Sequence, residues 1–331
     1  MTSAVRMGVR IGGLQLANPI MPASGCFGPE LGQLIDLNRL GALVTKTIFY
    51  EPRSGNPADR LTEVGAAMLN SVGIPSPGVE AFIAEMLPRY LAWRPPTIVS
   101  IGGLSVDEYL RLADRLADVE GISALELNIS CPNLEAGGLE IGADPRSVEQ
   151  VVRGVVDRSR VPVIAKLTPN VTSVVEIARA SEAGGADAVS AINTLVGMGV
   201  ELRTRRTRIG NITGGVSGPA IKPVALRMVW SVARALSIPV IGVGGIASAE
   251  DVLEFMVAGA SAVQLGSVNF THPDAMLRAI DGVEDWLRAE KISDVNELIG
   301  SLETGPMEHD LTAFNEYGAR VDGPRTAQRG A

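Results

Sequence analysis

The sequence is poor in several residue types, and each shortage excludes a class of protein. Its 331 residues include only two cysteines and two histidines. Cys26 and Cys131 cannot form a disulfide framework of the secreted kind. His272 and His309 are too few for histidine-rich metal binding or for triad chemistry. We therefore expect a chain in a reducing compartment, without a metal site of its own.

Three further absences narrow the function. No apolar run is long enough to span a bilayer, and the first residues lack the apolar core of a signal peptide. No Gly-x-Gly-x-x-Gly follows a strand, so a built-in nicotinamide-binding unit is not expected. The net charge is −8, which provides no overall basic field for nucleic acid. We expect a cytoplasmic protein that binds neither membrane nor nucleic acid.

What is present is a regular alternation of short apolar segments and helical patterns. The sequence predicts strands at residues 19–23, 43–48, 97–101, 124–130, 162–167, 187–192, 239–243 and 262–265. It predicts helices at residues 78–91, 106–119, 145–157, 172–183, 223–236 and 249–257, with Ser105 and Ser248 as N-caps of two of them. Eight strands, each followed by a helix or a long excursion, favour an α/β fold of the (β/α)8 TIM-barrel type. A doubly wound open sheet is the alternative, but it usually has fewer strands and a glycine fingerprint.

The excursions locate the functional face of this barrel. Residues 49–77 and 196–218 are long and rich in glycine or proline, and long loops after barrel strands lie at the C-terminal, catalytic face. The basic run at residues 203–208 predicts a solvated hairpin. We expect one barrel domain over residues 1–303, followed by a loosely ordered polar tail at 304–331.

The stretch at residues 124–133 is the strongest candidate for chemistry. Polar Glu126, Asn128 and Ser130 alternate with apolar neighbours, and Pro132 then ends the strand. Cys131 is thus held at a strand exit among amide side chains. A thiolate can act as a general base in a chain that is so poor in imidazole. Cys26 is interpreted as a residue that fills space beside the first strand.

Two lysines and two glycine-rich segments add to this candidate site. Lys46 and Lys166 lie in apolar strands, which indicates an anionic or electron-rich ligand in the barrel mouth; an internal ion pair, for instance with Glu126, is the other interpretation. Glycine-rich segments at residues 242–248 and 264–267 follow the last two strands, where barrels of this type bind phosphate.

These motifs together resemble the class 1 dihydroorotate dehydrogenases, the FMN enzymes of pyrimidine synthesis, and especially the 1B subclass. Asn-Ile-Ser-Cys-Pro-Asn at residues 128–133 is similar to the active-site motif of that family. The segments at 22–28, 68–74, 214–223 and 242–246 match further family motifs in order. The resemblance runs from about residue 9 to residue 302.

The resemblance implies roles for individual residues. Cys131 would remove the C5 proton of dihydroorotate, with Lys46 between flavin and substrate. The implied FMN contacts are Ser24, Lys46, Thr47, Ser100, Asn128, Lys166, Ile192 and Gly218, with Gly244, Gly245, Gly266 and Ser267 around the phosphate. The implied substrate contacts are Lys46, Asn70, Ser71, Val72, Gly73, Ile74, Asn128, Asn133, Asn193 and Thr194. Ser100 stands where most close relatives carry asparagine.

The chain lacks groups that could pass the electrons onward. Two cysteines cannot supply the four thiolates of a [2Fe–2S] cluster. We therefore expect an external redox partner, with NAD as final acceptor. The resemblance to the 1B subclass implies that this partner is a subunit with FAD and a [2Fe–2S] cluster, bound to a homodimeric core, possibly within a heterotetramer. The alternatives are a fumarate-dependent homodimer, a related dihydropyrimidine dehydrogenase, and a barrel that only binds ligands. Asn133 argues against the dihydropyrimidine enzymes, which tend to carry histidine after Cys-Pro.

Overall fold

A central barrel of parallel strands organises the molecule. The computed structural model describes residues 5–130, 132–133 and 139–304. The barrel strands are β3 (Ile20–Pro22), β4 (Leu43–Val44), β7 (Thr97–Ile101), β8 (Ile122–Asn128), β11 (Val163–Leu167), β12 (Ala188–Ala191), β17 (Val240–Val243) and β18 (Ala262–Leu265). They form one sheet in the order β3-β18-β17-β12-β11-β8-β7-β4. The TIM-barrel prediction is therefore confirmed.

The two ends of this sheet meet at a glycine. The amide of Gly41, just before β4, donates to the carbonyl of Ile20 in β3 at 2.8 Å. A Cβ atom at Gly41 would overlap the carbonyl of Asn18, so the strands can approach this closely only with glycine there. The sheet is thereby nearly closed.

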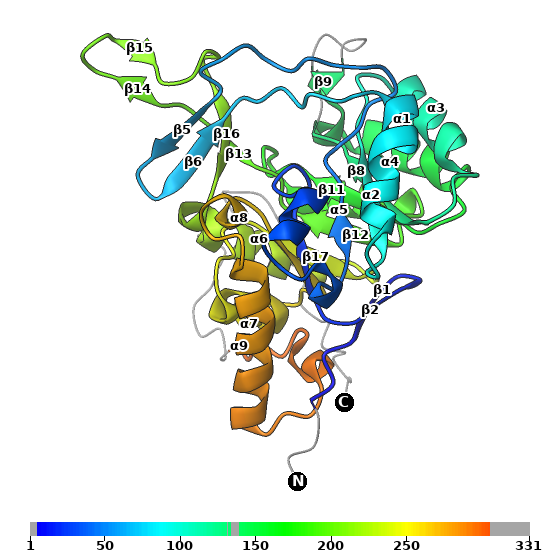
Figure 1. Cartoon of the computed structure of the whole chain (residues 1–331), viewed down its shortest axis with the longest axis vertical. Helices are drawn as coiled ribbons and strands as arrows, with labels where there is room; N and C mark the ends of the chain where they lie inside the picture. The colour runs from blue at the N-terminus through cyan, green and yellow to red at the C-terminus, as the bar shows by residue number, and fades with distance from the viewer. Residues whose placement is uncertain (1–4, 131, 134–138, 305–331) are drawn as a thin grey trace, which may run out of the picture.

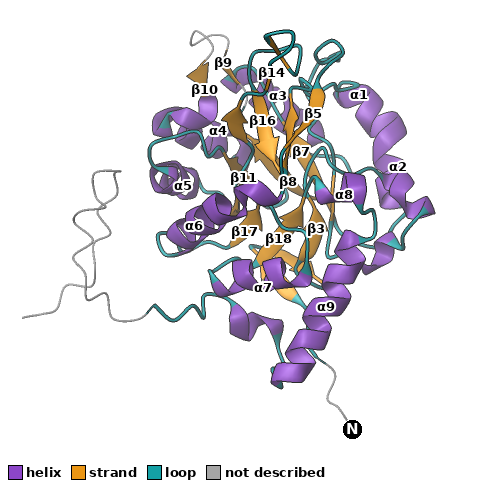
Figure 2. Ribbon diagram, turned by 90° about the vertical axis from the view of Figure 1, so that its left-hand side faces the viewer, coloured by secondary structure: helices purple, strands orange, loops and turns teal. Residues whose placement is uncertain are grey.

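Helices surround the strands (Figure 2). They are α1 (Val79–Ala81), α2 (Leu87–Leu91), α3 (Val106–Leu116), α4 (Pro145–Val156), α5 (Val174–Ala183), α6 (Lys222–Ala233), α7 (Ala249–Val257), α8 (Val268–Thr271) and α9 (Ala275–Glu290). On α3 the buried side chains Tyr109, Leu112, Ala113 and Leu116 repeat at helical spacing and face the barrel. The predicted caps are confirmed, because Ser105 accepts from the amide of Glu108 and Ser248 from that of Asp251.

The helix predicted at residues 78–91 has an irregular middle. A π-helical segment, η3 (Phe82–Met86), separates α1 from α2. Pro88 lies in the following turn and has no amide to donate, which interrupts the regular ladder. Helix α9 lies outside the predicted helix ranges, but the sequence His272-Pro-Asp indicates a helix start, and Asp274 is the N-cap of α9.

The long excursions form strands of their own above the barrel. A four-stranded sheet joins β5 (Leu61–Val64) and β6 (Ala67–Asn70) to β13 (Leu195–Gly197) and β16 (Gly214–Ser217), all antiparallel. We call this sheet the roof (Figure 1). The remaining short strands are β1 (Val9–Ile11), β2 (Leu14–Leu16), β9 (Pro132–Asn133), β10 (Leu139–Glu140), β14 (Val200–Glu201) and β15 (Arg206–Thr207).

The predicted basic hairpin is confirmed as the β14–β15 pair, which projects beside the roof in Figure 1. Its four arginines are exposed. The predicted tail falls, from residue 305 onward, outside the described residues.

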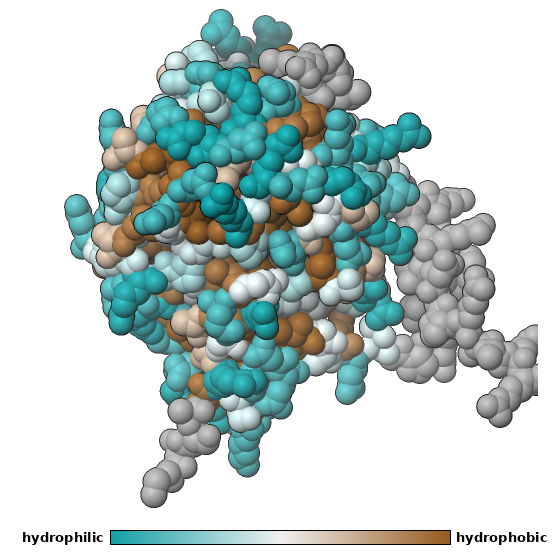
Figure 3. Space-filling view, turned by 90° about the vertical axis from the view of Figure 1, so that its right-hand side faces the viewer, coloured by the Kyte–Doolittle hydropathy of each residue, from teal (hydrophilic) through white to brown (hydrophobic). Residues whose placement is uncertain are grey.

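The surface is mixed in character. Figure 3 shows a face on which hydrophilic side chains alternate with smaller hydrophobic groups. Single exposed apolar residues of this kind are normal for a globular protein. In the part of the chain that the structure describes, no helix has both the length and the apolar character needed to cross a bilayer.

Candidate functional site

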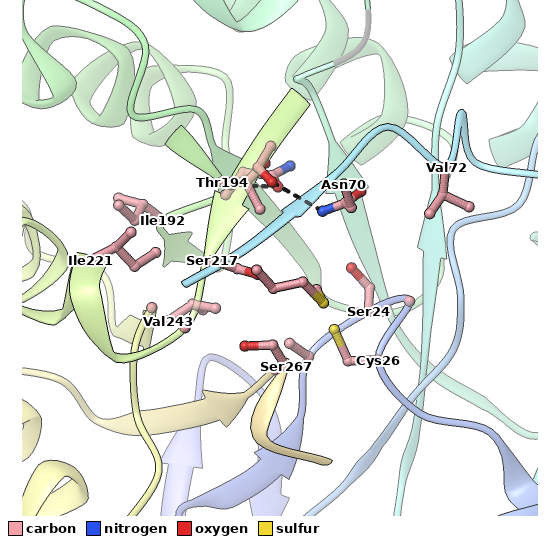
Figure 4. A pocket seen from close by; sticks show the side chains of 18 of the residues that line it. Ser24, Cys26, Asn70, Val72, Ile192, Thr194, Ser217, Ile221, Val243 and Ser267 are labelled. Atoms are coloured by element: carbon pink, nitrogen blue, oxygen red, sulfur yellow. Dashed lines mark hydrogen bonds between the residues drawn. The ribbon is translucent and has the colours of Figure 1, made fainter. Parts of the chain in front are cut away.

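A cavity of about 430 Å³ opens at the carboxyl ends of the barrel strands, beneath the roof. Its wall includes these predicted residues: Ser24, Lys46, Thr47, Asn70, Val72, Gly73, Ile74, Asn128, Lys166, Ile192, Asn193, Thr194, Gly218, Gly244, Gly245, Gly266 and Ser267. Figure 4 shows Asn70 and Thr194 on one side of the cavity, with Ser24, Cys26 and Ser267 on the other. Segments from both halves of the chain therefore meet here.

Lys166 lies at the floor of the cavity. Its ammonium donates to Ser24 Oγ and to Gln264 Oε1, both at 3.2 Å, and lies 3.5 Å from Glu126 Oε1. The ion pair with Glu126 that the sequence suggested is present. Lys166 also lines the cavity, so a ligand contact for this lysine stays a prediction beside the observed ion pair.

A chain of amide and hydroxyl groups crosses the cavity wall. Asn193 Nδ2 donates to Asn128 Oδ1 and to Ser130 Oγ, each at 3.0 Å, and Asn193 Oδ1 accepts from the Thr194 amide at 2.8 Å. Asn128 Nδ2 approaches Thr47 Oγ1 at 3.4 Å. These bonds fix the side chains in orientations that present donors and acceptors to a planar polar ligand.

Lys46 lies at the edge of the same wall, after β4. Burial lowers the pKa of its ammonium, and the positive charge of Arg60 lowers it further. An anionic ligand beside Lys46 would reverse this shift, because it favours the charged form. An anionic ligand would therefore bind favourably beside Lys46.

The roof closes the cavity from above. Asn70 Nδ2 in β6 donates to the carbonyl of Gly215 in β16 at 3.3 Å (dashed line in Figure 4). Asn170 holds the neighbouring strand, since its Nδ2 donates to the Thr194 carbonyl at 3.1 Å and its Oδ1 accepts from the Val196 amide at 2.9 Å.

At one end of the cavity, backbone comes unusually close to backbone. Gly244 and Gly245 have φ values of 129° and 76°, and a Cβ at Gly245 would lie 2.7 Å from the Lys222 nitrogen. Asp251 braces this loop: its Oδ2 accepts from the Ala247 amide at 2.8 Å, and its Oδ1 lies 2.6 Å from the ammonium of Lys222. Such a glycine turn before a helix exposes amides that suit a phosphate.

Four predicted residues do not line the cavity or cannot be placed there. Ser100 is fully buried behind Thr47, whose Oγ1 lies 2.9 Å from its hydroxyl. Ser71 is not among the residues that line the cavity, and its backbone is hydrogen-bonded to Arg60 and Asn56. Cys131 lies outside the described residues, and the side chain of Asn133 is likewise not described.

Several lining residues were not predicted. They include Ser130, Asn170 and Ser217, together with Cys26. Ser130 and Ser217 lie within motifs that the sequence analysis identified, so their position beside predicted site residues could have indicated them. Asn170 follows the end of β11 by three residues, a position that barrel geometry associates with the catalytic face. Cys26, interpreted as filling space, in fact faces the cavity (Figure 4).

The cavity has no described metal-binding group. Among residues 5–304, leaving aside 131 and 134–138, no three His, Cys, Asp or Glu side chains gather as a metal site would require. What the cavity offers is two cations, a row of amides and a glycine turn, an arrangement suited to a flat anionic ligand beside a phosphate.

Comparison with known proteins agrees with this geometry. Residues 6–287 match the family model for dihydroorotate dehydrogenase. The chain is 50% identical over 298 residues to the dihydroorotate dehydrogenase B (NAD(+)) catalytic subunit of Alkaliphilus oremlandii, covering 89% of this chain and 98% of that protein. It is 49% identical over 299 residues to the subunit of the same name from Trichlorobacter lovleyi, covering 90% and 98%. This chain belongs to the dihydroorotate dehydrogenase family.

Proposed function

We propose that this protein is the catalytic subunit of an NAD-dependent dihydroorotate dehydrogenase. It oxidises (S)-dihydroorotate to orotate in pyrimidine biosynthesis, in the cytoplasm, with residues 1–303 as the catalytic domain. The observation that carries the proposal is the single cavity wall that brings Lys166, the amides of Asn128 and Asn193, and the Gly244–Gly245 turn together. The names of the relatives support the same reaction.

FMN fits the residues present. The Ser217 hydroxyl lines the cavity and is buried, yet within the described chain it has no hydrogen-bond partner, so a bound ligand would satisfy it. We assign Gly244, Gly245, Gly266 and Ser267 to the phosphate. Lys166, with Ser24 and Thr47, would hold the ring system. When bound, FMN supplies a two-electron acceptor for the hydride from C6 of the substrate.

The chain's own residues orient the substrate and take its proton. The donors and acceptors of Asn70, Asn128, Asn193 and Thr194 match the ureide groups and carboxylate of dihydroorotate. Cys131 accepts the C5 proton as a thiolate. Loss of that proton and of the C6 hydride leaves the C5–C6 double bond of orotate, so the reaction balances.

Electrons leave through a partner. We propose a subunit with FAD and a [2Fe–2S] cluster that passes them to NAD, around a homodimeric core. The sequence has too few cysteines to ligate such a cluster itself. The term "catalytic subunit" in the names of the relatives supports a second subunit.

Anaerobic addition of dihydroorotate to the FMN-loaded protein tests the reaction. We expect the flavin absorption to bleach, whereas dihydrouracil and dihydrothymine should leave it unchanged. NAD, fumarate and a quinone are then offered separately, with and without a co-purified partner. NAD should reoxidise the flavin only with the partner. Reoxidation by fumarate alone would refute the partner assignment, and absence of bleaching would refute the function.

Cys131→Ala tests the assigned base. The variant should bind FMN as the parent does but reduce it at least about a hundredfold more slowly, the usual size of a general-base contribution. Stopped-flow bleaching measures the rate, and the flavin content of the purified protein is the control. Reduction at the parent rate would show that Cys131 is not the base.

A further inference from the structure

Four polar side chains form a connected group inside the barrel, below the cavity. Glu126 from β8, Lys166 from β11, Ser190 from β12 and Gln264 from β18 are all buried. Glu126 Oε2 accepts from Gln264 Nε2 at 2.6 Å and from Ser190 Oγ at 3.2 Å, and Glu126 Oε1 lies 3.5 Å from Lys166 Nζ. Each strand contributes one member, so the group spans the barrel interior.

Gln264 links the two charges in a fixed orientation. Its Nε2 donates to Glu126 while its Oε1 accepts from Lys166 at 3.2 Å. The flipped orientation of this amide would satisfy neither partner. The carboxylate and the ammonium are therefore held at a constant separation.

Stability alone does not account for this group. Burying two charges costs several kcal/mol of desolvation per ion, and well-packed apolar residues often stabilise a protein core as well or better. The side chains of Lys166 and Glu126 are 5% and 0% exposed. We therefore infer that this buried ion pair acts on a ligand in the adjacent cavity.

Only one of the two charges reaches that cavity. Lys166 lines it, with its ammonium 3.2 Å from Ser24 Oγ, whereas Glu126 lies behind the lysine. Any effect of Glu126 on a bound ligand therefore passes through Lys166 and through its electric field. In a low-dielectric interior such fields extend over several ångströms.

We propose that Glu126 is a positioning residue and internal counter-ion of Lys166 that lowers the reduction potential of the bound flavin. This inference rests on the proposed FMN site. Taking up two electrons and one proton gives the flavin ring one additional negative charge, which Lys166 stabilises and Glu126 opposes. The carboxylate thus keeps the flavin reducing enough to pass its electrons onward, while it holds the ammonium in place.

Glu126→Gln removes the charge and keeps the shape. The new amide oxygen can still accept from Lys166 and the new NH2 can donate to Ser190 Oγ, whereas the contact with Gln264 Nε2 is lost because both groups are donors. The midpoint potential of bound FMN, measured by anaerobic titration against a redox dye, should become more positive. We expect the reduction equilibrium to shift about tenfold toward reduced flavin, or about 30 mV for a two-electron couple.

A second variant removes the charge without adding a donor. Glu126→Leu leaves no NH2 group facing Gln264 Nε2 and should also make the potential more positive. Glu149→Gln is the matched control, because Glu149 is an exposed glutamate on α4 that pairs with Arg153 at 2.7 Å. Its potential should equal that of the parent protein, since its charge is screened by solvent.

The outcomes separate this inference from the proposed function. A parent protein that takes up no FMN would overturn both. FMN-loaded Glu126→Gln with an unchanged or more negative potential would overturn the counter-ion role alone. If Glu126→Gln retained no FMN, Glu126→Leu would decide: a potential that does not rise would overturn the role. A purely structural role would change flavin content or melting temperature without this rise of the potential.

Discussion

At the scale of single residues, the Cys26 thiol shows how the cavity wall controls reactivity. Burial raises the pKa of this thiol from 9.0 to about 11, partly offset by the nearby positive charge of Lys166. Since the thiolate is the reactive form, the half-buried Cys26 should be inert at ordinary pH. It is therefore not a second candidate for the base, although it faces the same cavity.

Alkylation measures this difference directly. At pH 9 a free thiol is about half ionised, whereas Cys26 should be about 1% thiolate. In the Cys131→Ala background, where Cys26 is the remaining cysteine of the sequence, iodoacetamide should label the folded protein roughly fiftyfold more slowly than the urea-unfolded chain. Mass spectrometry follows the labelling. Equal rates in the two states would contradict the assigned burial.

The same shift gives a pH dependence of stability. The unfolded chain releases the Cys26 proton near pH 9, whereas the folded chain keeps it to about pH 11. The stabilisation from Cys26 is therefore fully present below pH 9 and is lost as the pH rises toward 11. Urea titrations of the parent and of Cys26→Ser at pH 8 and pH 10 should show a larger loss for the parent. A parallel loss in both would refute the effect.

At the scale of elements, the loop before α7 connects helix capping with phosphate binding. Asp251 accepts from the amides of Ala247 and Ser248 and pairs with Lys222, whose pKa it raises. Asp251→Ala should cost roughly 1 kcal/mol of unfolding free energy, as loss of a cap does. It should also weaken FMN binding about tenfold while changing riboflavin binding little, because only FMN carries the phosphate.

A cap elsewhere provides the control. Asp144 caps α4 by accepting from the Ser147 amide at 3.0 Å, far along the chain from the glycine turn. Asp144→Ala should lose similar stability, measured by urea titration, and keep the parent ratio of FMN to riboflavin affinity. If both variants changed that ratio alike, Asp251 would have no specific role at the phosphate.

The roof can be tested through one glycine. Gly214 in β16 lies against β6, and a Cβ there would overlap the carbonyl of Asn70. Gly214→Ala should separate the two strands and weaken orotate binding about tenfold, measured by titration calorimetry. Gly13→Ala is the matched control, since its Cβ would meet Pro162 at an ordinary 3.4 Å. Unchanged orotate binding in Gly214→Ala would show that the roof does not shape the site.

The barrel could be predicted from sequence, whereas the roof could not. Short apolar strands such as β7 and β11 are buried along their whole length, so composition and length identify them. The roof strands are three to four residues long and only partly buried, and their pairing joins distant segments. The periodicity of apolar residues within one segment cannot predict which distant segment it pairs with.

The candidate site follows the same division. Lysines and asparagines at strand ends could be predicted, because barrel geometry sends every strand end to one face. Ser100 shows the limit: its position on β7 was right, but the pleat turns it behind Thr47. Which loop residues, such as Asn170 and Ser217, reach the cavity depends on contacts made only in three dimensions.

At the scale of the whole molecule, the cavity links ligand binding to folding. Its wall is assembled from several barrel strands and the roof, so the FMN site that we propose exists in the folded chain and not in the unfolded one. At a free FMN concentration of a hundred times Kd, the unfolding free energy should rise by about 2.7 kcal/mol. Thermal melts at several FMN concentrations measure this, with NAD as the control that should not stabilise the isolated chain. A melting temperature independent of FMN would contradict the proposed site.

The pairing of β6 with β16 also sets the order in which this protein becomes competent during its synthesis. Asn70 and Gly215, which bond across the roof, are 145 positions apart in the sequence. Strands β7, β8 and β11 leave the ribosome earlier, but the cover over them waits for β16. A nascent chain that ends before Gly214 lacks this cover, and strands β17 and β18 of the barrel are made later still, so the proposed substrate site forms only after about four fifths of the 331 residues have been made.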